Sequence, residues 1–158
     1  MSDTIASTEP GTSAMHMSRV FDAPRKLVFE AMAKEEHLLN WFGPNDYPVV
    51  RWTHDFTPGG AFTYAMRGPD GQEAGAGGEY LEITENERIV ALSRIDANGE
   101  TIFEVRQTYT FEDAGGGTKL TIDAQILTNK GFPGAGGMNE GWKQTLDRLN
   151  TYLAQLTA

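Results

Sequence analysis

The stretch GMNEGWKQTLDRLNTYLAQL, residues 137–156, lies at the end of the sequence and decides how the rest of the chain can fold. Its large apolar residues recur every three or four positions, at Trp142, Leu146, Leu149, Leu153 and Leu156. This spacing is typical of an amphipathic helix, whose apolar stripe must lie against another layer. Gly141 interrupts the pattern directly before Trp142, although a glycine inside a helix costs about 1 kcal/mol relative to alanine.

Most of the preceding sequence predicts strands, because it is rich in β-branched and aromatic residues. The predicted strands cover residues 15–21, 49–56, 61–67, 79–83, 88–95, 101–112 and 118–127. Asn98-Gly99 is the strongest turn signal between them, since a two-residue hairpin turn needs positive φ at both positions. Connections this short make neighbouring strands antiparallel. Two short helices are expected over 22–33 and 34–44.

This order of elements predicts an α+β fold, in which the terminal helix covers one face of an antiparallel sheet. A sheet of this many strands curls through its own twist, and the terminal helix is the one predicted element long enough to cover the concave face. Residues 1–14 are rich in Ser, Thr, Gly and Pro and are expected to form a disordered leader. Residues 15–158 then form one domain.

The composition argues against several classes of protein. The chain has 13 basic and 22 acidic residues, a net charge of −9, which disfavours binding to nucleic acids and to anionic membranes. No apolar run approaches the ~20 residues of a membrane span. Cysteine is absent, so disulfides and thiolate sites are excluded. The first residues lack the apolar core of a secretory signal, and we expect a cytoplasmic location.

No metal site or cofactor is predicted. The three histidines, His16, His37 and His54, show no short ligand spacing. The sequence GAGG occurs at 75–78 and 134–137, but neither copy lies in the strand-to-helix setting of a dinucleotide-binding loop. The chain also lacks the G-x-S-x-G elbow of a serine hydrolase.

Several polar residues fall on the inward faces of the predicted strands. Alternation places these side chains inside: Trp52, His54, Phe62, Tyr64, Met66, Tyr80, Glu82, Gln107 and Tyr109. Two interpretations remain open. The polar groups could bond one another in a solid core, which the pattern by itself favours because satisfied buried polar groups are common. Alternatively, apolar walls with a few placed polar groups form a small-molecule pocket.

Five segments resemble a known family in the same order along the chain. They are RVFDAPRKLVFEAMAKEEHLLNWFGP (19–44), DFTPGGAFTYAMRGPDG (55–71), GEYLEITENERIV (78–90), TYTFEDAGGGTKLTI (108–122) and GMNEGWKQTLDRLNTYL (137–153). The chain thereby resembles the START-like, polyketide-cyclase-like (SRPBCC) superfamily, and within it the bacterial homologues of the activator of heat-shock protein 90 ATPase. The similarity extends from about residue 15 to the end.

The resemblance implies a helix-grip fold, in which a curved antiparallel sheet wraps around the long C-terminal helix and two short helices close one end. Proteins of this superfamily often hold a hydrophobic ligand between sheet and helix. We therefore expect Trp52, Phe62, Tyr64, Tyr80 and Trp142 to converge around a void. The full set of expected ligand-binding residues is Trp41, Trp52, His54, Phe62, Tyr64, Tyr80, Gln107, Met138 and Trp142.

Three functions are compatible with this resemblance, because a fold alone does not determine activity. The first is binding of a small hydrophobic ligand, aromatic or lipid-like. The second is an enzyme, a cyclase or hydrolase, that uses His54 or Glu82 as acid–base in the same cavity. The third is a cochaperone-like interaction domain. The expected partner is a small hydrophobic ligand, with a homodimer as a further possibility and no nucleic acid or membrane.

Overall fold

Seven strands and three helices make up the part of the chain that the structure, a computed structural model, describes, residues 12–132 and 137–158. The elements are β1 (Thr12–Phe21), α1 (Arg25–Ala33), α2 (Glu35–Trp41), β2 (Val49–His54), β3 (Ala61–Arg67), β4 (Glu73–Thr84), β5 (Arg88–Ala97), β6 (Glu100–Ala114), β7 (Gly117–Asn129) and α3 (Met138–Thr157). The predicted domain start at residue 15 falls inside β1, and most of the predicted leader, residues 1–11, lies outside the described residues.

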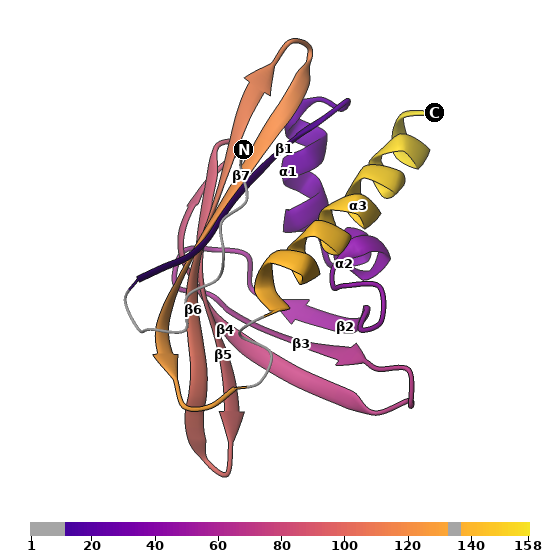
Figure 1. Cartoon of the computed structure of the whole chain (residues 1–158). Coiled ribbons are helices and arrows are strands. Elements are labelled where there is room, and N and C mark those ends of the chain that lie inside the picture. Colours follow the sequence, from indigo (N-terminus) through magenta and orange to yellow (C-terminus); the bar gives the residue numbers. More distant parts are fainter. Residues whose placement is uncertain (1–11, 133–136) are drawn as a thin grey trace.

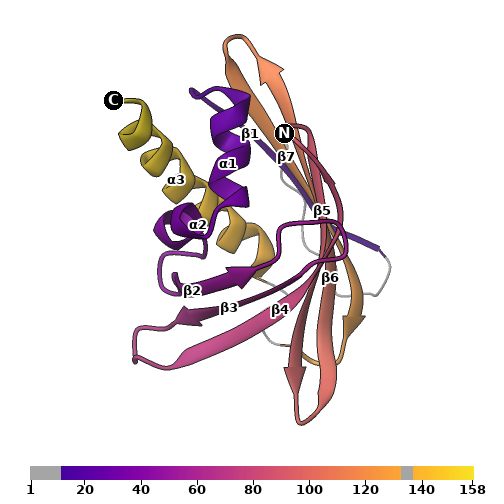
Figure 2. The same cartoon turned by 180° about the vertical axis from the view of Figure 1, so that it is seen from behind.

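The strands form one antiparallel sheet in the order β1-β7-β6-β5-β4-β3-β2. Figure 1 shows the three helices on the same side of the curved sheet, with β2, β3 and β4 curling beneath the first turns of α3. The opposite view in Figure 2 shows the same arrangement from behind. The predicted α+β helix-grip fold is confirmed, and the layer that α3 covers is the concave face of this sheet.

β4 begins six residues earlier than the sequence predicts, at Glu73 instead of Glu79. No strand is predicted for the intervening small residues, yet they pair in register with β3, with Ala74 opposite Met66 and Gly78 opposite Phe62. Close packing favours a glycine at 78, since a Cβ atom there would lie 1.7 Å from the Leu92 carbonyl oxygen. Pairing with β3, joined by pairing with β5 from Gly77 onward, thus overrides a weak strand propensity.

The prediction that Tyr80 and Glu82 share an inward face is wrong. The register between β4 and β5 shifts between these two residues, and such a bulge moves the following side chain to the other face. Tyr80 is buried, whereas Glu82 is exposed and its carboxylate pairs with Arg88 Nε at 3.0 Å. Ile83 packs against the core in its place.

The core lies between the concave face and the helices. Fully buried side chains come from α1, α2, β1, β6, β7 and α3, among them Val28, Trp41, Met15, Phe111, Ile122, Ile126 and Leu149. In α3 the apolar stripe is buried from Trp142 to Leu153, but Leu156 is 41% exposed. The buried part of the stripe is therefore shorter than the apolar pattern in the sequence, because the last turn of α3 extends beyond the layer that the helix covers.

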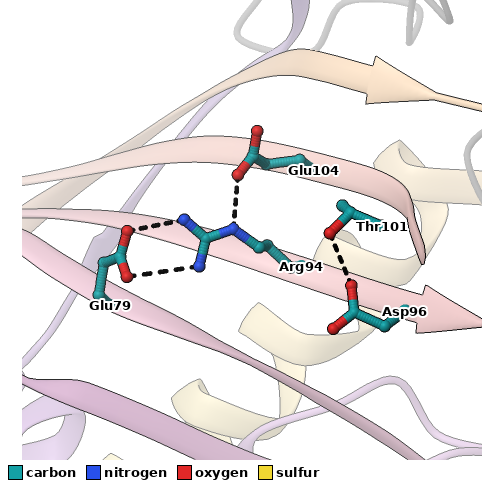
Figure 3. Close-up of polar contacts among 5 residues, drawn as sticks. All are labelled: Glu79, Arg94, Asp96, Thr101 and Glu104. Atoms are coloured by element: carbon teal, nitrogen blue, oxygen red, sulfur yellow. Dashed lines mark hydrogen bonds and ion pairs between the residues drawn. The ribbon is translucent and has the colours of Figure 1, made fainter. Parts of the chain in front are cut away.

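The convex face of the sheet carries several ion pairs. Figure 3 shows Arg94 of β5 between two carboxylates, with Nη2 2.7 Å from Glu79 Oε1 and Nε 2.6 Å from Glu104 Oε2. Thr101 Oγ1 donates to Asp96 Oδ1 at 2.7 Å on the same face. Exposed pairs of this kind add little to stability, so the convex face contributes solubility and strand register.

Candidate ligand-binding cleft

A cleft of about 660 Å³ opens between the first half of α3, the turn after α2 and the concave face of the sheet. We call it the α3 cleft. Its lining consists of Phe42, Gly43, Pro44, Tyr47, Tyr64, Met66, Ala74, Gly75, Ala76, Ile95, Gln107, Phe132, Met138, Gly141, Trp142 and Thr145. None of these described lining residues is an Asp, Glu, Lys, Arg or His. The α3 cleft therefore combines apolar walls with a few uncharged polar groups, as small-molecule sites do.

A much smaller cavity of about 20 Å³ lies deeper, which is about the space that one water molecule needs. Met32, Leu38, Phe42, Trp52, Phe62, Tyr64, Tyr80, Ile89, Ala91, Ser93, Gln107 and Tyr109 line this inner cavity. Phe42, Tyr64 and Gln107 line both spaces. These three side chains therefore form the partition between the inner cavity and the α3 cleft.

Phe42 holds the aromatic side of this partition together. Its ring centroid lies 5.1 Å from that of Trp52, 5.8 Å from Tyr64 and 5.6 Å from Trp142, each with the rings edge to face. Trp52 in turn stacks on Tyr64 with centroids 4.7 Å apart. Contacts of this geometry are favourable beyond the area they bury, so the wall is preorganised.

The first half of α3 forms the opposite wall of the cleft, and Gly141 is part of this wall. A Cβ atom at Gly141 would have no neighbour within 4 Å, so a side chain at this position would project into the α3 cleft. The hydroxyl of Thr145 donates to the Gly141 carbonyl at 2.8 Å and so is satisfied within the helix. The glycine keeps the cleft open, and close backbone packing is not its role.

The turn after α2 is tied to α3 by polar contacts. Arg148 Nη1 donates to the carbonyl oxygens of Phe42 and Gly43 at 3.2 and 2.8 Å. The Asn45 backbone N–H donates to Gln144 Oε1 at 3.0 Å. Burial lowers the pKa of Arg148 from its ordinary value, but an arginine stays charged at neutral pH. These contacts position Phe42 in the partition between the α3 cleft and the inner cavity.

Polar groups gather around Gln107. Its Oε1 accepts hydrogen bonds from the Ser93 and Tyr109 hydroxyls, both at 3.1 Å. Burial raises the pKa of Tyr64 to about 12. Burial also raises the pKa of Tyr109 well above its ordinary range, and the nearby Tyr64 and Tyr80 add to this effect. The hydroxyls of Tyr64 and Tyr109 therefore stay protonated at neutral pH and remain able to donate.

His54 belongs to a separate structural cluster. Trp52 Nε1 donates to His54 Nδ1 at 3.0 Å, and the Tyr80 hydroxyl lies 2.7 Å from the same nitrogen. Desolvation lowers the pKa of His54, partly opposed by Glu35 and by the Ala33 carbonyl. The ring is neutral at pH 7 and its lone pair is already engaged, which fits a positioning role better than that of a general base.

The predicted site residues fall into four groups. Trp52, Phe62 and Tyr80 line the inner cavity, Tyr64 and Gln107 line both spaces, and Met138 and Trp142 line the α3 cleft. Trp41 and His54 line neither space. Trp41 is fully buried and donates from Nε1 to the Ala31 carbonyl at 3.0 Å. Trp52, Phe62, Tyr64 and Tyr80 do converge, but the void among them is the small inner cavity.

Sequence reasoning missed several lining residues, above all Ile95 and the small residues at 74–76. The small residues carry a signal in retrospect, because a strand without bulky side chains leaves space beside it. Among the described residues, no group of three or more His, Asp or Glu side chains could hold a metal ion.

Comparisons with known proteins are consistent with this architecture. The family model described as "Activator of Hsp90 ATPase homolog 1-like protein" matches residues 22–154. A protein of Chromobacterium violaceum of solved structure is 28% identical, with a TM-score of 0.76 over 87% of this chain and 94% of its own. One from Nitrosomonas europaea is 26% identical, with a TM-score of 0.75 over 90% and 94%.

A solved structure from Silicibacter pomeroyi, described as an AHSA1 protein, is 22% identical with a TM-score of 0.76 over 89% of this chain and 96% of its own. At this identity the likeness concerns the fold alone. No protein with a curated description matches the sequence. None of the helices within the described residues is long and apolar enough to cross a membrane.

Proposed function

Because the chain belongs to the Activator of Hsp90 ATPase homolog 1-like family, within the START-like superfamily, we propose that it binds a small hydrophobic ligand in the α3 cleft. The observation that carries the proposal is the lining itself, about 660 Å³ of space bordered by apolar and uncharged polar side chains. Sites for drug-sized ligands occupy roughly 300–1,000 Å³ and have this composition.

The other two functions considered for the sequence gain no specific support. An acid–base enzyme needs a titrating group beside the substrate, and the described lining of the cleft has no Asp, Glu, Lys, Arg or His. Glu82, one of the two candidates, faces outward and pairs with Arg88. No observation favours a cochaperone role. A homodimer and a cytoplasmic location stay predictions.

A neutral dye that fluoresces in apolar surroundings tests the proposal directly. Prodan, a propionyl-dimethylaminonaphthalene, has roughly 17 non-hydrogen atoms, and at about 0.3 kcal/mol per atom this amounts to about 5 kcal/mol of binding free energy. The corresponding dissociation constant is about 0.2 mM, so the titration has to cover the micromolar to millimolar range. Native mass spectrometry of the purified protein would detect a retained ligand and the number of subunits.

A blocking variant distinguishes the cleft from the rest of the surface. Gly141→Phe directs a ring into the cleft, and its Cβ atom meets nothing within 4 Å. The matched control is Asn150→Phe, at an exposed position of the same helix. We expect Gly141→Phe to abolish dye binding and Asn150→Phe to preserve it. Equal binding by both variants would exclude the α3 cleft as the site.

A further inference from the structure

The closed end of the α3 cleft carries two polar side chains with unused hydrogen-bonding capacity, Gln107 and Tyr64. Both belong to the partition between the cleft and the inner cavity. Polar groups in an apolar pocket fix the orientation of a ligand, because each one left unpaired on binding costs free energy. Their donor and acceptor pattern therefore specifies the chemistry that the cleft selects.

The amide of Gln107 presents donors to the cleft. Its Oε1 accepts from the Ser93 and Tyr109 hydroxyls, which uses both lone pairs of the oxygen and satisfies both hydroxyl donors. The reversed amide would leave those two O–H groups without an acceptor in a buried place. The orientation with Oε1 inward is therefore the better satisfied one, and it leaves the two N–H groups of Nε2 available.

The hydroxyl of Tyr64 is the second free group. Within the described part of the chain this hydroxyl makes no hydrogen bond, and burial is the one cause of its raised pKa. Tyr64, Gln107 and Tyr109 line the same inner cavity, and the Tyr109 hydroxyl is bonded to Gln107. Tyr64 and Gln107 thus offer neighbouring donors at one end of the cleft.

The same surroundings disfavour a charged ligand. The described lining of the cleft contains no basic side chain to pair with a carboxylate and no acidic side chain to pair with an amine. The guanidinium of Arg148 is bound to the carbonyl oxygens of Phe42 and Gly43. Transfer of an unpaired charge into such a site is strongly unfavourable.

We infer that the ligand is a neutral, mainly apolar molecule with a hydrogen-bond acceptor, such as a ketone oxygen, at its leading end. Gln107 Nε2 and the Tyr64 hydroxyl receive this oxygen, while the apolar body lies between Trp142, Met138 and the small residues of β4. This inference rests on the proposed function and adds to it the polarity and direction of the ligand.

Three dyes that share one ring system test the inference. Prodan carries a ketone, its propyl analogue lacks the acceptor, and dimethylaminonaphthoate carries a charge. The parent protein should bind prodan about three to ten times more tightly than the propyl analogue, the range expected for one net hydrogen bond. It should bind the naphthoate least. Bound prodan should emit at longer wavelength than it does in hexane, because its carbonyl accepts a hydrogen bond.

Tyr64→Phe removes the free hydroxyl and no hydrogen bond within the described residues, so the fold should persist. We expect this variant to lose the preference for prodan and to shift prodan emission to shorter wavelength. Its matched control is Tyr152→Phe, because Tyr152 lies in the second half of α3 and lines neither the α3 cleft nor the inner cavity. Gln107→Met is a second variant, with circular dichroism to confirm that it folds.

The outcomes separate the inference from the proposed function. If no dye binds to the parent protein, both fail. If prodan and its propyl analogue bind equally and Tyr64→Phe changes neither affinity, the inference is overturned while ligand binding stands. Tightest binding of the naphthoate would also overturn it. Loss of the preference in Tyr64→Phe and Gln107→Met, with Tyr152→Phe unchanged, supports it.

Discussion

The two halves of α3 belong to one helix but border different interiors. In the first half, Gly141 and Trp142 line an open cleft, and Gly141 has no neighbour in the direction of its missing side chain. In the second half, Leu149 is 0% exposed and Leu153 2% exposed, and neither lines the cleft. An identical helical period thus produces a cleft wall at one end and a solid core at the other.

This difference arises from what faces each half. β2, β3 and β4 curl beneath the first turns of α3, and small residues at 74–76 leave space there. The second half lies alongside β1 and α2, where Arg19 pairs with Asp147 at 2.6 Å and His37 lies 2.5 Å from the Tyr152 hydroxyl. Stability should therefore depend mainly on the second half of α3, and ligand affinity on the first.

The largest expected change in stability comes from Leu149→Ala. Truncation of a fully buried leucine leaves a cavity and should lower the free energy of unfolding by about 2–5 kcal/mol. Urea denaturation monitored by tryptophan fluorescence measures this loss. Prodan affinity of the folded variant should stay within about twofold of the parent value, the scatter typical of distant, independent sites. A parallel loss of affinity would mean that the two halves of α3 are not separate.

Trp142→Ala should reverse that balance. A fully packed tryptophan typically costs about 3–5 kcal/mol on truncation, but one side of Trp142 borders the cleft, so we expect about 1–3 kcal/mol. Prodan affinity should fall about tenfold, because the wall against the ligand is removed. If the variant is as unstable as Leu149→Ala and binds the dye normally, Trp142 is ordinary core.

Gly141→Ala should stabilise the protein by up to about 1 kcal/mol, since alanine is the better helix former and its methyl group meets nothing within 4 Å. Affinity for a bulky dye should fall slightly at the same time, because the methyl group occupies part of the cleft. Thermal melts and dye titrations measure the two effects together. A destabilised variant would show that a neighbour does close over this position.

The smallest expected effect concerns pH and His54. Its pKa in the folded state is lowered by desolvation, so the unfolded chain binds the proton more readily. The associated stability is complete above the unfolded pKa of about 6.5 and is lost as the pH falls through that value toward the folded pKa. Melts between pH ~8 and ~5 should show a smaller decline for His54→Gln than for the parent protein. An equal loss of stability in His54→Gln and in the parent protein would contradict a lowered pKa of His54 in the folded state.

Much of the fold is predictable from local pattern. Alternation in 101–112 correctly placed Gln107 on the inward face, and the helical period correctly buried Trp142 and Leu149. Glu82 shows the limit of this reasoning, because one bulge in β4 reverses every later side chain and leaves no mark in the sequence. The glycines at 75–78 show another, since pairing with β3, and with β5 from Gly77 onward, overrides their weak propensity.

The sequence by itself therefore determined the element order, the family resemblance, the absence of cysteine and the amphipathic character of α3. Only the tertiary structure decided where space remains. Hydrophobic periodicity reports which side of an element is turned away from water, and it is the same for a packed seam and a cavity wall. Whether Gly141 faces a neighbour or a void depends on strands that are distant in sequence, so the pattern predicts an interior but not the cleft within it.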